Sequence, residues 1–278
     1  MDICFAVNKD YIAQLDVTLT SIFCNKNTND ELNIYILTDN LKENIKQFFI
    51  RKYKQIKFIE IDEARFKDYP LVTQSSLSVY YRLILPSLFP QLDKILYLDC
   101  DLVVTSSLKD LYHLEIEDYL LAAVEDIGIP KYLPHHLTKL DINKYFNAGI
   151  LLLNLEKLRT EDFENKFHSY IQKNNTNLLF QDQDVLNVLC QNNVLFIDSK
   201  YNQQITPQNQ DSKQCISTIL HYAGSKKPWN FIWFSTPYSI YWKYVAKSHF
   251  KFYFIKTFLS ALNKNLKLFI KYLIKENI

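Results

Sequence analysis

Two aspartates, Asp99 and Asp101, directly follow a continuous apolar run, Ile95 to Leu98, within the stretch from Lys94 to Thr105. Such a run is typical of a strand buried on both faces of a mostly parallel sheet. Side chains two residues apart on a strand share a face, so both carboxylates reach one point beyond its carboxyl end, where open α/β sheets bind ligands. Two like charges held this close need a cation between them, and divalent cations prefer oxygen ligands. The pair therefore indicates a metal site, although an Asp-x-Asp triplet alone fits a solvated strand end equally well.

Four further polar clusters come at the end of predicted strands or at the start of predicted helices. They are Ala6 to Tyr11, Tyr145 to Gly149, Gln181 to Asp184 and His221 to Trp229. Acidic residues suit the positive end of a helix dipole, which accounts for Asp182 or Asp184 without any catalytic role. It does not account for the two glutamines beside them. A lone His221 is more often a core residue than a ligand, so these clusters become informative only as a set.

An alternation of strands and helices positions these clusters. We predict strands at 3–7, 34–37, 56–61, 95–98, 120–124, 148–155, 195–197 and 219–222, and helices at 12–24, 41–52, 78–88, from about 155 to 172, and from Gln181 onward. Residues 128–144 look like a long loop or a pair of short helices. The opening βαβαβ order predicts an α/β fold with a doubly wound sheet.

Composition excludes several classes of protein. Only three glycines occur in 278 residues, so neither a GxGxxG turn nor a P-loop can be built, which excludes a Rossmann dinucleotide site and a Walker-type nucleotide site. The five cysteines are odd in number and form no CxxC pair, so we expect a reducing compartment and no structural zinc. The length allows one large α/β domain or two small ones.

The C-terminal segment 243–278 differs in charge from the rest of the chain. It has eight lysines and one acidic residue, a charge of +7, whereas the remaining 24 basic and 29 acidic residues give −5. On a helix, one face would carry Ile255, Phe258, Leu259, Leu262, Leu266, Phe269, Ile270 and Leu273, and the other Lys256, Lys264, Lys267, Lys271 and Lys275. We expect a basic amphipathic helix on an anionic membrane surface. The alternative is a helix packed on the body of the protein.

Other features of the chain bear on its location. Its start has no basic region, and no apolar run reaches 18 residues, so we expect neither a secretory signal nor an ordinary transmembrane helix. Together with the basic tail, this predicts a cytoplasmic protein attached peripherally to the inner face of the cytoplasmic membrane.

Taken together, the five clusters resemble those of family 8 of the retaining glycosyltransferases, including its bacterial lipooligosaccharide α-galactosyltransferases. The resemblance extends from about Asp2 to Trp229, with the order and rough spacing of all five clusters intact. It implies a GT-A type, doubly wound, mixed but mostly parallel sheet with a C-terminal helical tail. The catalytic domain would be 1–242, with a UDP-sugar-binding half at about 1–105 and a sugar and acceptor half at about 106–242. The membrane-surface tail would be 243–278.

The resemblance assigns the first group of ligands. It implies that Asp99, Asp101 and His221 bind Mn²⁺, with Mg²⁺ as the alternative, and that the metal holds the two phosphates of a UDP-sugar. Mixed carboxylate and imidazole ligation suits Mn²⁺ better than Mg²⁺. Lys227 and Gly224 match positions that contact the diphosphate. Lys226 fits a solvated charge.

The nucleoside would lie at the first strand. The resemblance places Ala6, Asn8 and Tyr11 in the uridine pocket, with Tyr11 stacked on uracil, and places Cys100 at the nucleotide. Asn8 stands where the close relatives have Asp, but an amide both donates and accepts, so uracil recognition survives. Plain core packing is the alternative role for Tyr11.

The resemblance also places Arg82, Asn147, Asp182 and Gln183 around the transferred sugar. Arg82 would bridge a sugar hydroxyl and the carboxylate of Asp99, a bidentate use of guanidinium. Asp182 would accept hydrogen bonds from sugar hydroxyls and help choose the epimer. Gln183 lies where a nucleophile would be expected, but an amide is a poor nucleophile. We therefore favour same-face attack through an oxocarbenium-like state over a covalent intermediate.

The implied reaction is metal-dependent transfer of galactose or glucose from a UDP-sugar, with formation of an α-linkage. The acceptor would be a growing bacterial surface glycan such as lipopolysaccharide core, or a protein-linked or other glycan. The chain is shorter than its close relatives between Asn202 and Ile219, where they enclose the donor, so the acceptor stays open. We expect no nucleic-acid partner. Galactose versus glucose, linkage position and oligomeric state are not decided by the sequence.

Two rival functions remain. Asp99 to Val103 after an apolar strand also fits the nucleophile signature of haloacid-dehalogenase-like phosphatases, but these place it on the first strand, whereas about 90 residues precede it here. The second rival is a catalytically inactive sugar-nucleotide-binding or scaffold protein, which the complete set of metal and sugar residues speaks against.

Overall fold

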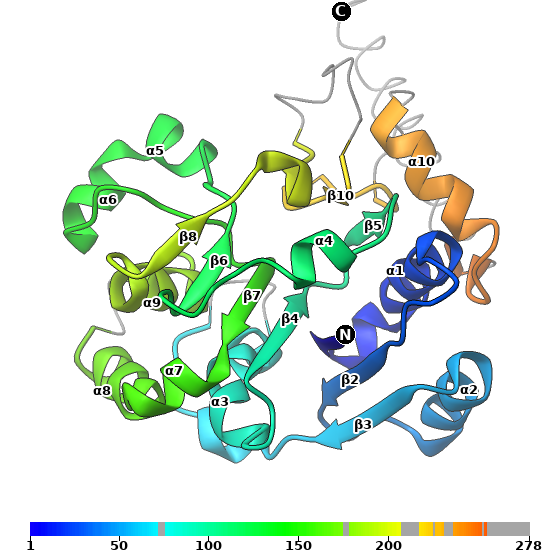
Figure 1. The fold of residues 1–278 in the computed structure, drawn as a ribbon, viewed down its shortest axis with the longest axis horizontal. Helices are drawn as coiled ribbons and strands as arrows, with labels where there is room; N and C mark the ends of the chain where they lie inside the picture. The colour runs from blue at the N-terminus through cyan, green and yellow to red at the C-terminus, as the bar shows by residue number, and fades with distance from the viewer. Residues whose placement is uncertain are drawn as a thin grey trace, which may run out of the picture. The chain divides into compact units, whose positions relative to one another are not determined.

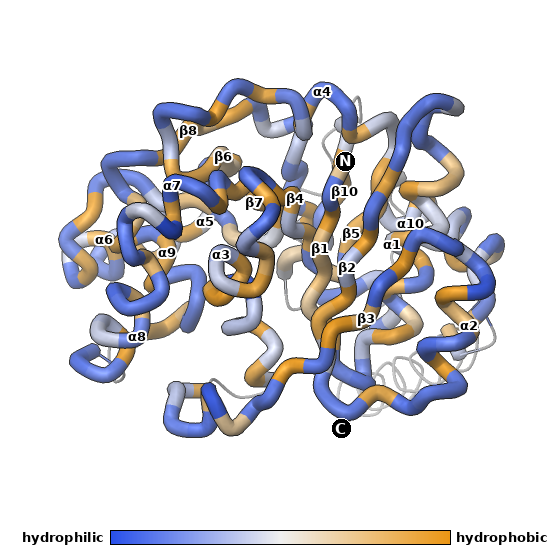
Figure 2. Tube along the Cα trace, turned by 60° about the horizontal axis from the view of Figure 1, so that its bottom comes forward, coloured by the Kyte–Doolittle hydropathy of each residue, from blue (hydrophilic) through white to orange (hydrophobic). Residues whose placement is uncertain are grey.

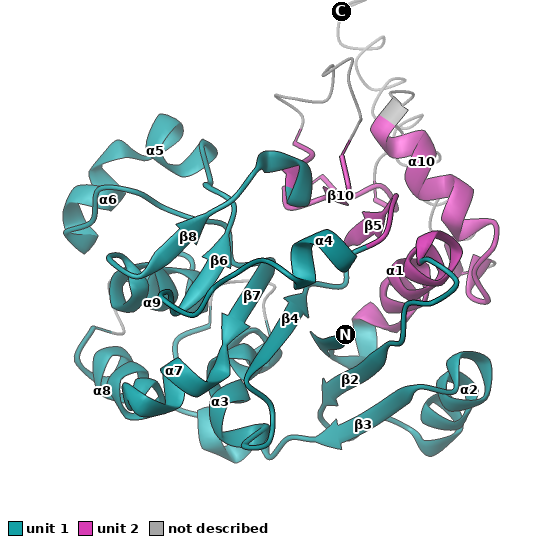
Figure 3. Cartoon of the chain, viewed as in Figure 1, with its two compact units in different colours: residues 1–10, 27–100, 108–202 teal, residues 11–26, 101–107, 203–278 magenta. Residues whose placement is uncertain are grey.

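A computed structural model of the chain describes residues 1–71, 76–174, 178–206, 217–224, 226–230, 236–251 and 253–254. These residues form two compact units, each assembled from separate stretches of the chain (Figure 3). The first unit comprises residues 1–10, 27–100 and 108–202, and the second comprises residues 11–26, 101–107 and 203–278.

The first unit contains a seven-stranded sheet in the order β3-β2-β1-β4-β7-β6-β8 (Figure 1). Its strands are β1 (Asp2–Ala6), β2 (Asn33–Thr38), β3 (Ile56–Glu60), β4 (Lys94–Leu98), β6 (Leu121–Ala123), β7 (Ile150–Asn154) and β8 (Val194–Phe196). All neighbouring pairs are parallel except those made by β7, which runs antiparallel to β4 and β6. The expected α/β fold with a doubly wound, mixed and mostly parallel sheet is therefore confirmed.

Helices and short 3-10 turns connect these strands. They are α2 (Glu43–Tyr53), η2 (Glu63–Phe66), η3 (Leu77–Ile84), α3 (Leu85–Leu88), α4 (Lys109–Tyr112), α5 (Gly128–Tyr132), α6 (Pro134–Leu140), α7 (Leu155–Thr160), α8 (Phe163–Asn174), α9 (Asp182–Cys190) and η5 (Ser199–Tyr201). The central strands are apolar along most of their length, as the orange tube in Figure 2 shows, because helices cover them. Thus α7 packs against β4 and β7, and η3 packs against β1 and β2. Of the two structures expected for residues 128–144, the pair of short helices is the one observed.

Strand direction explains why polar clusters from distant parts of the chain converge in this unit. The strands β1, β4 and β6 point the same way, so the residues after each of them reach the same edge of the sheet. Because β7 is antiparallel to them, the residues before it reach that edge too. Asn8, Asp99, Asp126 and Asn147 all come from these four positions.

The second unit is built on a three-stranded sheet in the order β5-β10-β9 and two helices. These elements are α1 (Ile12–Asn25), β5 (Leu102–Val104), β9 (Gln203–Gln204), β10 (Ile219–His221) and α10 (Thr236–Val245), preceded by the turn η1 (Lys9–Tyr11). Its core is aromatic, with Tyr222, Trp229, Tyr238, Tyr241 and Phe254 all buried. The sequence predicted the strand at 219–222 but not this second sheet, since β5 and β9 are too short to show a periodic pattern.

The start of the predicted C-terminal tail belongs to the folded second unit. Tyr244 and Val245, at the end of α10, and Phe254 are buried in its aromatic core, and the hydroxyl of Tyr244 accepts a hydrogen bond from Asn25 Nδ2 at 2.7 Å. The predicted helix from residue 255 onward lies outside the described residues. Among the helices that the structure describes, none has the length and apolar character needed to cross a membrane.

Candidate active site

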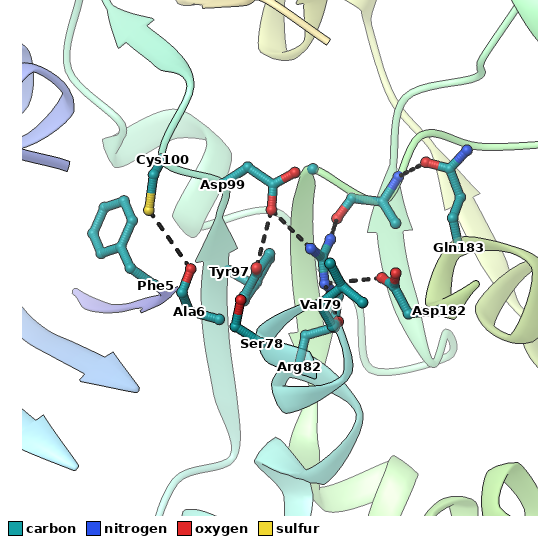
Figure 4. A network of polar contacts seen from close by, with 12 residues as sticks. Phe5, Ala6, Ser78, Val79, Arg82, Tyr97, Asp99, Cys100, Asp182 and Gln183 are labelled. Atoms are coloured by element: carbon teal, nitrogen blue, oxygen red, sulfur yellow. Dashed lines mark hydrogen bonds and ion pairs between the residues drawn. The ribbon is translucent and has the colours of Figure 1, made fainter. Parts of the chain in front are cut away.

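Arg82 is the centre of the polar site in the first unit. It lies on η3 with only 7% of its surface exposed. Its Nη2 donates to Asp99 Oδ1 at 2.8 Å, its Nη1 donates to the carbonyl of Ala148, and its guanidinium lies over the ring of Tyr97. Figure 4 shows the guanidinium between Asp99 on one side and Asp182 on the other. The planar guanidinium of arginine can donate to several fixed partners at once, which the single ammonium of lysine cannot do in the same geometry.

The pairing of Arg82 with Asp182 leaves part of the carboxylate unsatisfied. Arg82 Nε is 3.1 Å from Asp182 Oδ2, but it donates its hydrogen bond to the carbonyl of Val79. Asp182 Oδ2 is buried and accepts no hydrogen bond from the described residues. A buried acceptor of this kind is suited to a donor hydroxyl from a bound molecule.

Burial and charge set the protonation of this group. Burial raises the pKa of Asp182 to about 7, an effect that Arg82 only partly offsets and that the charge of Asp99 reinforces. Burial lowers the pKa of Arg82, but the charges of Asp182 and Asp99 outweigh burial and raise it above its ordinary value. The guanidinium therefore stays charged, while Asp182 changes charge near neutral pH.

Asn147 and Gln183 are held by the turn that precedes β7. Gly149 N donates to Asn147 Oδ1 at 3.0 Å and Asn147 Nδ2 donates to Asp126 Oδ2 at 3.4 Å, which fixes the amide. Gln183, on the first turn of α9, accepts a hydrogen bond from Ala148 N at 2.9 Å through its Oε1 (Figure 4). The structure thus brings Arg82, Asp99, Asn147, Asp182 and Gln183 to one edge of the sheet.

The residues expected at the nucleoside divide between the units. In the first unit, Cys100 is buried and its Sγ donates to the carbonyl of Ala6 at 3.6 Å, which ties the end of β4 to the end of β1. Asn8 follows at the same strand end, and its Oδ1 accepts a hydrogen bond from Asp10 N at 3.0 Å. In the second unit, Tyr11 is 36% exposed and meets Trp229 edge to face, with ring centroids 6.2 Å apart.

Asp101 and His221 form the polar centre of the second unit. Asp101 precedes β5 and His221 ends β10, and these two strands are paired antiparallel. His221 Nε2 lies 3.3 Å from Asp101 Oδ1. The ammonium of Lys227 donates to the other oxygen of Asp101 and, at 2.6 Å, to the carbonyl of Tyr222. Gly224 lies between Tyr222 and Lys227 in the sequence and is partly exposed.

This carboxylate is strongly acidic. Burial raises the pKa of Asp101, but the charges of Lys227 and His221 outweigh burial and hold it well below its usual range. Asp101 is therefore ionised at every physiological pH, as a metal ligand must be.

Several residues that complete the site were not predicted from the sequence. Tyr97 donates to Asp99 Oδ1 at 3.0 Å, and Asn202 Nδ2 donates to Asn147 Oδ1 at 3.0 Å. Asp126 was visible only as an acidic strand end. The signals for Tyr97 and Asn202 are weak, because a tyrosine in an apolar strand is indistinguishable from core and Asn202 lies 55 residues from Asn147.

The sequence also matches a known family. The model of glycosyl transferase family 8 covers residues 2–232. The chain belongs to this family. This family 8 glycosyltransferase is 28% identical over 247 residues to a lipopolysaccharide 1,2-glucosyltransferase of Escherichia coli K12, covering 83% of this chain and 73% of the relative. It is 26% identical over 257 residues to a lipopolysaccharide 1,3-galactosyltransferase of Salmonella typhimurium, covering 86% and 76%.

Solved structures agree with the family. The crystal structure of the galactosyltransferase LgtC in complex with donor and acceptor sugar analogs matches with a TM-score of 0.79 at 26% identity, covering 90% of this chain and 96% of that one. The GT-A fold expected from the sequence is thereby confirmed. The family also excludes the phosphatase alternative.

Proposed function

We propose that this family 8 enzyme is a metal-dependent, retaining hexosyltransferase that uses UDP-galactose or UDP-glucose. The observation that carries the proposal is the pair of polar centres on either side of Cys100. Asp99 belongs to one centre, together with Arg82 and Asp182. Asp101 belongs to the other, together with His221. A single residue separates the two aspartates, so the chain itself keeps their carboxylates within reach of one ligand.

The donor set suits a divalent cation of the Mn²⁺ type, with Mg²⁺ as the alternative. Asp99, Asp101 and His221 supply two carboxylates and an imidazole. The acidity of Asp101 keeps one ligand charged and the burial of His221 fixes its ring. When bound, the cation supplies charge neutralisation for the departing diphosphate. Lys227 adds a cation from the protein itself, and Gly224 leaves room for a close backbone approach.

The first centre would bind and orient the transferred sugar. Asp182 Oδ2 accepts from a sugar hydroxyl, Arg82 holds Asp182 and Asp99 in place, and Asn147 presents an amide fixed by Gly149 and Asp126. The side-chain carbonyl of Gln183 accepts a hydrogen bond from Ala148 N, which supports a positioning role and not nucleophilic attack. We therefore retain same-face substitution, in which a phosphate oxygen of UDP takes the acceptor proton as the C1–O bond to UDP breaks.

We propose that Ala6, Asn8, Tyr11 and Cys100 hold the nucleoside. Tyr11 offers an aromatic face for uracil, supported from the side by Trp229. Asn8 and Ala6 offer polar groups at the end of β1, and Cys100 fixes the adjacent strand end. The names of the relatives support glucose or galactose as the transferred sugar and a lipopolysaccharide as the acceptor. The lipopolysaccharide core as the acceptor region and the α-linkage are part of our proposal.

A panel of UDP-sugars scored by UDP release tests this proposal. We expect metal-dependent release from UDP-galactose or UDP-glucose and little from UDP-N-acetylglucosamine, because discrimination depends on whether buried partners such as Asp182 stay paired. Chelation should abolish the release. Absence of release with every donor, with and without Mn²⁺, would favour an inactive sugar-nucleotide-binding protein.

We further propose that the segment after Phe254 attaches the enzyme to the cytoplasmic face of an anionic membrane. Of the eight lysines, Lys243, Lys247 and Lys251 lie on the folded unit and the other five follow it. Each lysine near an anionic leaflet contributes on the order of 1 kcal/mol, screened by salt, which gives reversible attachment.

Charge reversal in the full-length chain tests the membrane proposal without removing core residues. Replacing Lys264, Lys267, Lys271 and Lys275 by Glu should abolish sedimentation with phosphatidylserine vesicles at low salt and leave UDP-sugar hydrolysis unchanged. The matched control reverses four exposed lysines elsewhere, Lys42, Lys54, Lys139 and Lys173. Equal loss in both variants would show that net charge, not the tail, drives binding.

A further inference from the structure

A polar network lies wholly buried beneath the first turn of α9. Asp184 and Tyr145 are 0% exposed and His136 is 4% exposed. Asp184 Oδ1 accepts from the hydroxyl of Tyr145 at 2.5 Å and lies 2.8 Å from Nε2 of His136. Asp184 Oδ2 accepts from the backbone N–H of Phe180 at 2.9 Å. A buried carboxylate that is hydrogen-bonded to a hydroxyl, an imidazole and a backbone N–H is held in one orientation. We call this network of Asp184, Tyr145 and His136 the junction.

The network joins α6 to two segments that carry sugar-side residues. His136 comes from α6, Tyr145 from the turn that holds Asn147, and Asp184 from α9 directly after Asp182 and Gln183. Residues that select a donor epimer must be placed to within a fraction of an ångström. The junction is therefore positioned to set the geometry of Asp182 and Gln183 without touching the sugar.

The backbone just before α9 needs such a restraint. Gln181 has φ 49° and ψ −117°, a conformation that residues with a side chain rarely adopt. Asp184 bonds the N–H of Phe180, on the far side of this strained residue. Loss of the carboxylate's fixed orientation would allow the 180–183 segment to relax.

His136 contributes a hydrogen bond more than it contributes packing. Nε2 faces the carboxylate and so carries the donated proton, while Nδ1 is buried with no hydrogen-bond partner among the described residues. A phenylalanine ring would pack against Tyr145 and Phe180 without burying a polar nitrogen. The imidazole is therefore accounted for by its bond to Asp184.

We propose that His136 and Tyr145 are positioning residues that, through Asp184, fix Asp182 and Gln183 and thereby set turnover and donor-sugar selectivity. This inference rests on the proposed hexosyltransferase function. It assigns a role to α6, which lies outside the five sequence clusters. Under this proposal α6 acts on the donor site through Asp184 and does not itself contact the donor.

Kinetics of matched variants test the proposal. His136→Phe and Tyr145→Phe should each lower kcat with the preferred UDP-hexose by about ten- to a hundredfold, the range typical of small misplacements, with KM changed less than about threefold. The ratio of rates with UDP-galactose and UDP-glucose should also move toward one. His136→Gln, whose amide donates from a similar position, should recover most of the loss. His135→Phe, at the exposed neighbouring position, is the control and should behave as wild type.

Hydrogen exchange of the free protein separates this inference from the proposed function. In His136→Phe, amides of the segment 178–187 should exchange faster, while amides of α1 keep the wild-type rate. An inactive wild-type protein would overturn the hexosyltransferase function, yet exchange would still test the junction. Unchanged exchange in 178–187, or a kcat loss in His136→Phe without any change in donor ratio, would overturn the positioning role.

Discussion

The two polar centres of this glycosyltransferase are built in different ways. In the first unit, Arg82, Asp182 and Asn147 are buried at the edge of a seven-stranded sheet and bond mainly to one another and to backbone. In the second unit, Asp101 and His221 meet across a pair of three-residue strands, with Lys227 from the following loop. In our proposal the first centre selects the sugar, and the second binds the diphosphate and, together with Asp99, the metal.

This difference predicts separable losses of function. A change in the second centre should weaken the electrostatic stabilisation of the leaving group, which the reaction needs with every donor sugar. Such stabilisation is commonly the largest single contribution to rate acceleration. A change in the first centre should alter which sugar reacts and how well the protein holds together.

Replacing Asp101 by Asn should cause the largest loss. The variant keeps the size of the side chain but removes the charge that pairs with Lys227 and His221, so metal binding should fail. We expect kcat to fall by about 10³-fold or more. Steady-state UDP release with and without added Mn²⁺ measures this, and full activity of the variant in chelator would contradict the metal assignment.

Replacing Arg82 by Ala should destabilise the first unit as well as inactivate it. The buried guanidinium pairs with the buried Asp182 and the partly exposed Asp99, and removal of one member of a buried pair costs roughly 3–5 kcal/mol. Urea unfolding of the purified variant gives the change in the free energy of unfolding. Replacing Arg65 by Ala at an exposed ion pair with Glu164 is the control, where we expect about 0–1 kcal/mol. Equal effects would contradict the central role of Arg82.

The raised pKa of Asp182 predicts a pH dependence of stability. Because the folded pKa is about 7 and the unfolded value is lower, the folded state binds the proton more tightly. The contribution is fully present only below pH 3.8, the ordinary pKa of the carboxyl, and is lost as the pH rises from there through 7. Asp182→Asn should flatten this part of the curve of unfolding free energy against pH. An unchanged curve would show that Asp182 does not titrate in this range.

Replacing Trp229 by Phe should give the smallest effect. Trp229 supports Tyr11 edge to face, and aromatic pairs of this kind contribute about 0.5–1.5 kcal/mol, or roughly two- to tenfold in the Kd of UDP. Titration of UDP followed by calorimetry measures it, with kcat expected to change little. Tyr132→Phe, at an exposed position of the first unit, is the control. A larger loss of kcat than of affinity would place Trp229 nearer to the reacting atoms than we propose.

How far the sequence predicted this structure depended on the kind of signal. Most strands of the main sheet contain apolar runs with clear ends, and the convergence of the polar residues after β1 and β4 follows directly from strand direction. For Arg82, the resemblance predicted the partner Asp99, and the structure shows that contact. The burial of Arg82 on η3 and its ion pair with Asp182 were not predicted, because a lone arginine in a helical pattern does not indicate how deeply it is buried.

The second unit was harder to predict for a physical reason. Its strands have two or three residues each, and it gathers α1, the stretch around Asp101 and residues 203–278. Such short strands depend on tertiary contacts more than on local propensity. The network of His136, Tyr145 and Asp184 was missed because Asp184 lies 48 residues from His136 and 39 residues from Tyr145 in the sequence.

Titration of Mn²⁺ by electron paramagnetic resonance tests the division of labour between the two centres most directly. The titration compares the wild-type enzyme with Asp101→Asn and Asp182→Asn in the presence of UDP. We predict that Asp101→Asn loses Mn²⁺ binding, whereas Asp182→Asn binds Mn²⁺ as the wild type does while its turnover of UDP-galactose and UDP-glucose falls. Wild-type Mn²⁺ affinity in Asp101→Asn, or loss of Mn²⁺ binding in Asp182→Asn, would contradict the assignment of Asp101 to the metal and of Asp182 to the sugar.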